Sequence, residues 1–167
     1  GAEAAHNKLR NSPRAYETLH RALKAVSKSS LRHKDAVTCV YPANFDDLSF
    51  IAESLIDYGF TSWRLFRIFP SGRAKNNAEL LLDFDHTRRL LDWVTEMRPV
   101  YAKRGLNLSY SCEGYLPLDE SLAVRSEPFL CRAGVNIASV LCDGTLTGCS
   151  NNAPAFYQGN FFDADFA

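Results

Sequence analysis

Apolar residues recur with a helical period in three stretches of the chain, 13–30, 46–58 and 84–104. In each stretch they are three or four positions apart, so that one side of a helix is apolar and the other polar. Ser12 and Pro13 suit the cap and first turn of a helix. Gly59 and Gly105 suit the position that follows a helix end. The pattern therefore predicts three amphipathic helices.

Short runs of β-branched and aromatic residues alternate with these helices and predict strands over 35–41, 61–69 and 106–111. Helices and strands that alternate with short connections favour a parallel sheet with helices packed on it. Three parallel strands alone leave unpaired edges. We therefore expect an α/β fold that is the C-terminal half of a partial (β/α)6 TIM-like barrel. A homodimer through the exposed sheet edge would cover one of those edges.

The character of the sequence changes after residue 111. The next twenty residues have no clear period and contain Pro117 and Pro128, which predicts a loop. Two β-branched runs then flank the pair Asp143-Gly144, which is typical of a β-hairpin. We expect a domain over 1–111 and a small hairpin extension over 112–167. The aromatic end FYQGNFFDADFA lacks a cap or charged tail, as expected of a truncated chain.

Charge and composition narrow the class of protein. Lys and Arg number 19 and Asp and Glu number 19, so no overall field attracts nucleic acid or an anionic membrane. No apolar run approaches the roughly 18 residues that a membrane helix needs. No signal-peptide pattern is visible at the start. The odd number of cysteines, 5, argues against a disulfide framework and for a reducing, cytoplasmic setting.

Four of the five cysteines fall toward the C-terminal end. We expect Cys39, in a predicted strand, to be a core residue, and Cys112 to belong to the core or a loop. Cys131, Cys142 and Cys149 frame the hairpin, where thiolates can converge on zinc or an iron–sulfur cluster. Zinc sites favour close pairs such as Cys-x-x-Cys, which the chain lacks, so the wide spacing favours a cluster.

The spacing Cys131-x12-Gly144-x4-Cys149 resembles the opening of the SPASM extension of radical S-adenosylmethionine enzymes. The run Cys131-Arg132-Ala133-Gly134 and the later Gly159-Asn160 are similar to that extension too. The resemblance implies that Cys131 and Cys149 bind an auxiliary [4Fe–4S] cluster. Cys142 is not at a usual ligand position, and the later cysteine run of the family is absent.

The first half of the chain resembles the barrel of the same superfamily. The residues that carry this likeness are His6-Asn7-x-x-Arg10, the strand exit Pro42-Ala43-Asn44 and the strand exit Pro70-Ser71-Gly72-Arg73-Ala74. The resemblance implies that four residues contact S-adenosylmethionine: Arg10, Leu65, Pro70 and Gly72. Arg10 would reach the methionine carboxylate, a charge-assisted contact, and Leu65 and Pro70 would line the adenine pocket.

Each of these assignments has a plainer alternative. Arg10 can be a solvated helix residue, Leu65 can be plain core, and Asn44 can be a helix cap. Arg64 and Arg67 lie three positions apart in a strand, so they point to opposite faces and at most one faces a barrel interior.

The family resemblance implies that the parent enzyme modifies a peptide or small-protein substrate through a 5′-deoxyadenosyl radical. The Cys-x3-Cys-x2-Cys motif that binds the radical-generating cluster is absent from the 167 residues. We therefore expect this chain alone to be inactive and to hold no cofactor. The rival interpretation is a non-catalytic α/β binding module with a cysteine-bound zinc at the hairpin.

Overall fold

The computed structural model describes residues 3–111 and 115–163, with the side chain of Arg73 excepted. The chain divides into two compact units, Gly1–Phe129 and Leu130–Ala167. Cys112 lies outside the described residues. No helix in the described part of the chain is long and apolar enough to cross a membrane.

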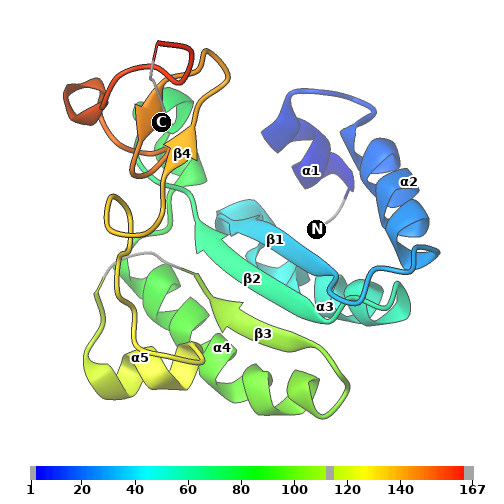
Figure 1. The fold of residues 1–167 in the computed structure, drawn as a ribbon. Coiled ribbons are helices and arrows are strands. Elements are labelled where there is room, and N and C mark those ends of the chain that lie inside the picture. The colour runs from blue at the N-terminus through cyan, green and yellow to red at the C-terminus, as the bar shows by residue number, and fades with distance from the viewer. Residues whose placement is uncertain (1–2, 112–114, 164–167) are drawn as a thin grey trace. The chain divides into compact units, whose positions relative to one another are not determined.

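The first unit is built on a three-stranded parallel sheet in the order β1 (Asp35–Val40), β2 (Ser62–Arg67) and β3 (Asn107–Tyr110) (Figure 1). Helix α3 (Leu48–Asp57) connects the first two strands, and α4 (Phe84–Ala102) connects the second and third. The predicted α/β class with parallel strands is confirmed. Within the described residues the sheet is open and does not close into a barrel.

The helix predicted over 46–58 begins slightly later in the structure. Residues Pro42–Asp47 form a 3-10 turn, η1, and α3 begins only at Leu48. Its end agrees with the prediction: Gly59 has a φ of 71°, and the N–H of Phe60 donates to the carbonyl of Leu55 at 2.9 Å. This is a Schellman ending, which needs a residue that tolerates the left-handed region.

One face of the sheet carries the hydrophobic core. Trp63 and Leu65 of β2 are fully buried beneath α3 and α4, together with Leu90 and Val94. The indole N–H of Trp63 donates to the Thr38 hydroxyl at 2.9 Å, so the largest buried side chain keeps its one polar group paired. Burial of this face against the helices is the main stabilisation of the unit.

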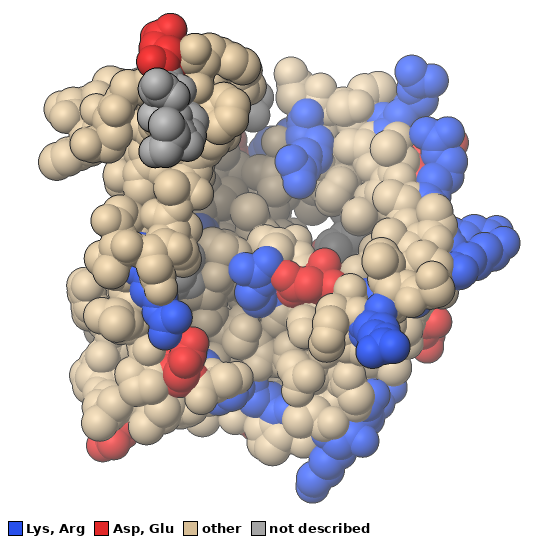
Figure 2. Space-filling model, in the orientation of Figure 1, with Lys and Arg blue, Asp and Glu red and all other residues tan. Residues whose placement is uncertain are grey.

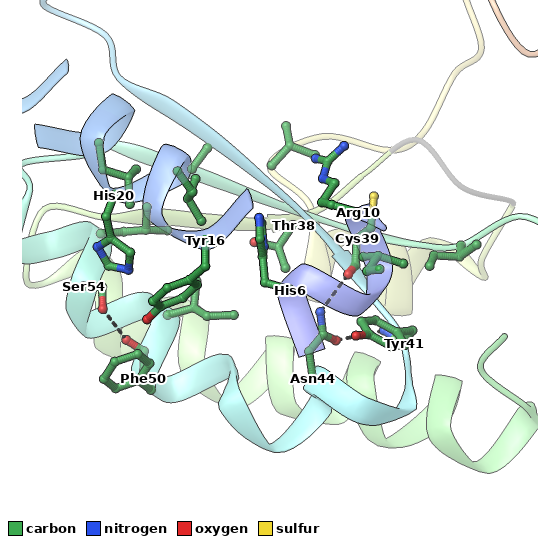
Figure 3. Close-up of a pocket in the computed structure, with 18 residues that line it drawn as sticks. His6, Arg10, Tyr16, His20, Thr38, Cys39, Tyr41, Asn44, Phe50 and Ser54 are labelled. Atoms are coloured by element: carbon green, nitrogen blue, oxygen red, sulfur yellow. Dashed lines mark hydrogen bonds between the residues drawn. The ribbon is translucent and has the colours of Figure 1, made fainter. Parts of the chain in front are cut away.

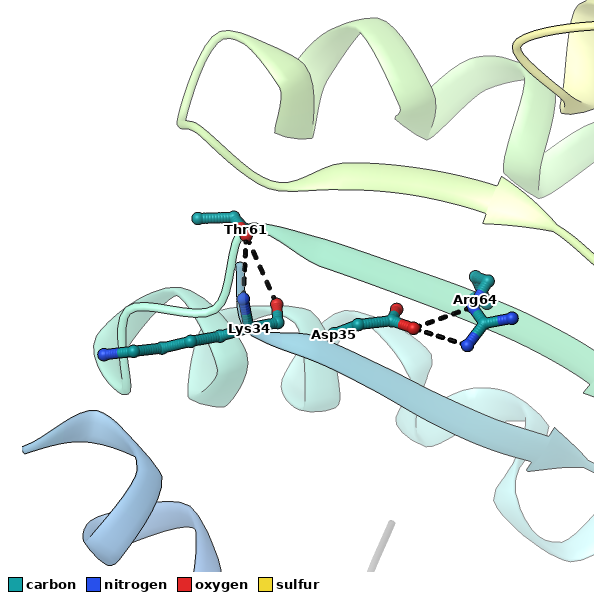
Figure 4. A network of polar contacts seen from close by, with 4 residues as sticks. All are labelled: Lys34, Asp35, Thr61 and Arg64. Atoms are coloured by element: carbon teal, nitrogen blue, oxygen red, sulfur yellow. Dashed lines mark hydrogen bonds and ion pairs between the residues drawn. The ribbon is translucent and has the colours of Figure 1, made fainter. Parts of the chain in front are cut away.

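The side chains on the opposite face of β1 are exposed, so that exposure alternates along the strand. Val37 is 51% exposed, and the Arg64 guanidinium donates to the Asp35 carboxylate at 2.9 and 2.5 Å (Figure 4). Cys39 lies on the same face and is exposed. The prediction that Cys39 is a core residue was therefore wrong, because a strand that looks buried in sequence has one open face.

The strand starts are also tied together by polar contacts. The Thr61 hydroxyl accepts from the Lys34 amide at 3.2 Å and lies 3.3 Å from the Lys34 carbonyl (Figure 4). Beside them, the Arg64–Asp35 pair joins β2 to β1 on the open face. Arg64 therefore lies on the exposed face of the sheet, with a carboxylate partner from the neighbouring strand.

Two helices precede the sheet: α1 (Glu3–Arg10) and α2 (Ala15–Ser27). The predicted cap at Ser12 is wrong, since α2 begins at Ala15 and Arg14 occupies the cap position without a side-chain bond. Asn7 of α1 supplies the bond instead, because its side-chain oxygen accepts from the Tyr16 amide at 2.8 Å. Helices α1 and α2 together form the α1–α2 hairpin.

A further helix, α5 (Leu118–Val124), occupies a segment predicted to be a loop. The prolines of this segment favoured a loop in the sequence. Pro117, however, lies in the cap position, where a proline removes no hydrogen bond of the helix. Arg98 of α4 donates to the carbonyls of Leu122 and Ala123, at 3.0 and 2.6 Å, and so holds the end of α5 on α4. The first unit consequently continues to Phe129, beyond the predicted boundary at 111/112.

The second unit contains the predicted hairpin. Strands β4 (Ser139–Val140) and β5 (Leu146–Thr147) are antiparallel, and Gly144 in the connection has a φ of 84°. A later segment is hydrogen-bonded to the hairpin, since the Leu146 amide donates to the Gly159 carbonyl at 2.9 Å. The hairpin is confirmed, with shorter strands than the β-branched runs suggested.

Three short 3-10 turns complete the described elements: η2 (Gly72–Ala74), η3 (Ala78–Leu80) and η4 (Pro154–Phe156).

Candidate functional sites

Two cysteine-bearing loops are in direct backbone contact in the second unit. A Cβ placed on Gly148 would lie 2.7 Å from the amide nitrogen of Gly134 and 3.1 Å from the carbonyl carbon of Ala133. Gly148 precedes Cys149 directly, and Gly134 follows Cys131 by three positions. The fold therefore brings the Cys131 and Cys149 loops together, and glycine is required for this approach.

The surroundings of Cys149 suit a metal-binding sulfur. The Asn151 amide donates toward the Cys149 Sγ at 3.5 Å, and the Thr147 hydroxyl donates to the Cys149 carbonyl at 3.1 Å. In iron–sulfur proteins, hydrogen bonds to the sulfurs are one of the interactions that set the reduction potential of the cluster. Cys131 is exposed, Cys149 is half-buried, and neither is in a disulfide.

The turn between these loops is held by Asp143. Its carboxylate accepts from the Thr145 amide at 3.0 Å, which lowers the pKa of that carboxyl, and its carbonyl accepts from the Asn160 side chain at 2.8 Å. Cys142 precedes Asp143 and is exposed. In residues 3–111 and 115–163 no three His, Cys, Asp or Glu side chains form a group that could hold a metal ion. Cys131, Cys142 and Cys149 therefore form no such group within these residues.

Three of the four residues predicted to contact S-adenosylmethionine lie at strand or helix ends, and one does not. Pro70 and Gly72 are exposed and follow the carboxyl end of β2. Arg10 is exposed at the end of α1. Leu65 is fully buried in the core.

Helix α1 lies beside the carboxyl end of β1. The hydroxyl of Tyr41, the residue after β1, donates to the Ala5 carbonyl at 2.8 Å. Because β1 and β2 are parallel, their carboxyl ends share one edge of the sheet. Arg10, Pro70 and Gly72 are therefore on the side of the sheet where α/β proteins place their sites.

A cavity of about 580 Å³ lies between the α1–α2 hairpin, β1 and α3 (Figure 3). Most of its lining is apolar, with polar side chains spaced along it. The lining residues are His6, Leu9, Arg10, Tyr16, Leu19, His20, Leu23, Ala36, Val37, Thr38, Cys39, Tyr41, Asn44, Phe50, Ile51, Ser54, Leu55 and Ile68. Segments far apart in the chain form this cavity, so no local pattern of the sequence predicts it.

Asn44 organises the end of the cavity that adjoins Arg10 and Cys39. Its side-chain oxygen accepts from the Tyr41 amide at 2.9 Å, and its side-chain nitrogen donates to the Cys39 carbonyl at 3.0 Å. Asn44 thus ties the strand exit to η1 and does not cap α3, the role considered for it from the sequence. Burial raises the pKa of Tyr41, whose hydroxyl is held by Ala5.

Aromatic rings line the inner side of the α1–α2 hairpin. Tyr16 lies between His6 and His20, with ring centroids 6.1 and 4.4 Å away. The Nδ1 atom of His20 is 3.3 Å from the Tyr58 hydroxyl, which links the hairpin to the end of α3. Burial, and then the charge of Arg10, lower the pKa of His6. A neutral His6 is therefore the form that this packing favours.

No family model matches the chain, and no curated protein matches it either.

Proposed function

We propose that the chain is part of a radical S-adenosylmethionine enzyme with a SPASM-type extension, whose parent modifies a peptide or small protein. The observation that carries the proposal is the contact of the Gly134 and Gly148 backbones, which brings together the loops of Cys131 and Cys149. These cysteines stand in the spacing Cys-x12-Gly-x4-Cys. The resemblance supplied the spacing, and the fold adds a physical reason why the two loops need glycine.

Cys131 and Cys149 would hold two corners of an auxiliary [4Fe–4S] cluster, with the other ligands supplied from outside this set of residues. Such a cluster supplies electron transfer, and the protein supplies ligation, orientation and insulation. The Asn151 amide, directed at the Cys149 Sγ, would stabilise the negative charge of the sulfur. Thiols that must stay reduced to bind iron suit the cytoplasm.

The first unit would be half of a partial barrel, and its carboxyl edge would face S-adenosylmethionine. Arg10 would pair with the methionine carboxylate, and Pro70 and Gly72 would lie against the cofactor from the exit of β2. Leu65 would support this edge from within the core, since it is fully buried. The chain alone lacks the Cys-x3-Cys-x2-Cys motif, so it would not cleave S-adenosylmethionine by itself.

The test is anaerobic reconstitution of the chain with iron and sulfide, followed by measurement of iron per chain and of the visible spectrum. The chain as isolated is expected to hold no cofactor, but with iron and sulfide supplied in the reconstitution we expect it to bind iron and to turn brown. The double variant Cys131→Ala/Cys149→Ala should lose that iron. The matched control Cys142→Ala should keep it, because Cys142 is exposed and outside the proposed ligand pair.

The zinc-binding module gives a different result in the same assay. Zinc also takes thiolate ligands, but a zinc protein is colourless. Zinc bound in place of iron, and lost in the same double variant, would support the rival function. Iron retained by the double variant would contradict the assignment of Cys131 and Cys149.

A further inference from the structure

Positive charge is concentrated in the first part of the chain. Residues 1–34 contain eight Lys and Arg against two Asp and Glu, a net charge of +6. The rest of the chain contains 11 Lys and Arg against 17 Asp and Glu, a net charge of −6. Lys and Arg side chains accordingly gather over α1 and α2 in the space-filling view (Figure 2). The balanced charge of the whole chain therefore includes a basic surface on the α1–α2 hairpin.

Much of this charge lies in a basic stripe on the outer side of α2. Side chains three, four or seven positions apart share one face of a helix. The apolar residues Leu23 and Val26 of α2 pack against the hydrophobic core, so the stripe on the other side of the helix faces away from it. The basic stripe consists of the exposed residues Arg14, Arg21, Lys24 and Lys28.

The basic stripe has no carboxylate partner among the residues that the structure describes. None of its four side chains forms an ion pair there. Glu17 is three positions after Arg14 and four before Arg21, the spacing of an ion pair on a helix, yet it pairs with neither. The charge of the stripe is thus available to a partner outside the chain.

The helix dipole accounts for only part of the basic stripe. Cations are favourable near the C-terminal end of a helix, which suits Lys24 and Lys28. Arg14, in contrast, occupies the N-cap of α2, where the dipole opposes a cation, and it makes no side-chain cap bond. A residue that weakens its own helix in this way is typical of a functional surface.

A membrane or a nucleic acid fits the basic stripe less well than a polypeptide. Helices that lie on membranes carry large apolar residues beside their basic face, whereas the exposed residues Ala22 and Ala25 lie beside this stripe. Single-stranded nucleic acids stack on aromatic side chains. The aromatic rings of α2, Tyr16 and His20, are half-buried and stack on each other on the inner side of the hairpin.

A second copy of the chain is also a poor occupant. Its acidic surface would have to meet the basic stripe head to tail, an arrangement that forms open chains unless it closes into a ring. Several of its carboxylates are moreover already paired with Lys or Arg of the same chain: Asp35, Glu53, Glu79 and Glu120.

We propose that the basic stripe of α2 binds an acidic segment of another polypeptide, through charge-assisted contacts between its carboxylates and the four basic side chains. Helices form the outer ring of an α/β barrel, so the outer side of α2 would stay accessible in the proposed parent enzyme. The stripe contains no cysteine and no residue of the carboxyl edge of the sheet. The inference therefore goes beyond the proposed function and can hold or fail independently of it.

The test is a calorimetric titration of the full chain with an acetylated, amidated octapeptide of alternating Glu and Ala. We expect binding in the micromolar range at about 50 mM salt, weakened at least about tenfold at about 300 mM salt, because salt screens exposed charges. The octapeptide of alternating Gln and Ala has the same shape without charge, and it should bind at least about tenfold more weakly at the lower salt concentration.

The double variant Arg21→Glu/Lys28→Glu should bind the acidic peptide at least about tenfold more weakly than the parent chain. Its matched control is Lys75→Glu/Lys103→Glu, which changes the net charge equally at two exposed positions outside the stripe and should keep most of the affinity.

The variant Arg14→Asp separates binding from helix stability. Aspartate is favourable at an N-cap, so this variant should unfold at a higher temperature and yet bind the acidic peptide at least about threefold more weakly. A role of Arg14 in folding alone would leave the affinity unchanged.

Four results would overturn the proposal. They are absence of binding at about 50 mM salt, equal affinity of the parent chain and Arg21→Glu/Lys28→Glu, and tighter binding of a single-stranded oligonucleotide or of phosphatidylserine vesicles than of the peptide. The fourth is self-association of the parent chain that the double variant loses, since a second copy would then be the occupant.

Discussion

Gly148 lies against Gly134 so closely that a single added methyl group would come within 2.7 Å of the Gly134 amide nitrogen. The φ angle of Gly148 is not in the left-handed region, whereas that of Gly134 is 74°. The two glycines are thus required for different reasons: Gly148 for space and Gly134 for its backbone conformation. Together they hold the loops of Cys131 and Cys149 in contact.

The variant Gly148→Ala should separate these loops. Because its backbone conformation accepts alanine, the only cost is steric, about 1–3 kcal/mol for overpacking. We expect earlier unfolding of the second unit and weaker iron binding after reconstitution. Ser150→Ala, at an exposed neighbouring position, is the control and should change neither. A Gly148→Ala chain as stable as the parent would show that the loops can move apart without cost.

Thr38→Val should destabilise the first unit although the two side chains have nearly the same shape. The change removes the acceptor for the Trp63 indole N–H, which is fully buried. A buried donor without a partner costs about 1–3 kcal/mol. Thr38→Ser keeps the hydroxyl and should cost less. Chemical denaturation measures both, and in a Trp63→Phe background the penalty of Thr38→Val should shrink; an undiminished penalty would exclude the indole bond as its cause.

Arg98→Met should loosen α5 from α4. The guanidinium of Arg98 donates to the carbonyls of Leu108, Leu122 and Ala123. A hydrogen bond from a charged donor typically contributes about 1.5–3 kcal/mol to stability. Methionine keeps much of the apolar part of the arginine side chain. Arg88→Met removes only the surface contact with Glu120 and should be nearly neutral. Hydrogen exchange within α5 should be faster in Arg98→Met alone; unchanged exchange would argue against this role.

The stability of the α1–α2 hairpin should depend on pH through His6. Burial and then the charge of Arg10 lower the pKa of His6 below its ordinary value of 6.5. The unfolded chain therefore takes up the proton first as the pH falls, so stability is highest above 6.5 and decreases below it.

The variant His6→Phe keeps a ring beside Tyr16 but does not titrate. Unfolding measured at about pH 7.5 and at about pH 5.5 should show a smaller acid loss in His6→Phe than in the parent. An equal loss in both would assign the pH dependence to other groups. His20 is the appropriate second position to examine, because its charge also lowers the pKa of His6.

Local periodicity was sufficient for the main elements of the first unit. The parallel strands β1, β2 and β3 and the helices between them were predicted, because each has an apolar side at its own period. The short helix α5 was missed, since its stability depends on Arg98, a partner that lies in another element. Cys39 was misplaced for a related reason: no sequence pattern tells which face of a strand remains uncovered.

The candidate sites follow partly from the sequence and partly from the tertiary structure. The sequence alone determined the spacing of Cys131, Gly144 and Cys149 and the glycines on which the hairpin depends, because these are properties of neighbouring residues. Only the tertiary structure decided that the Gly134 and Gly148 backbones touch, that Leu65 is buried, and that a cavity lies between the α1–α2 hairpin, β1 and α3. Contact and burial join residues distant in the chain, and sequence periodicity carries no information about such pairs.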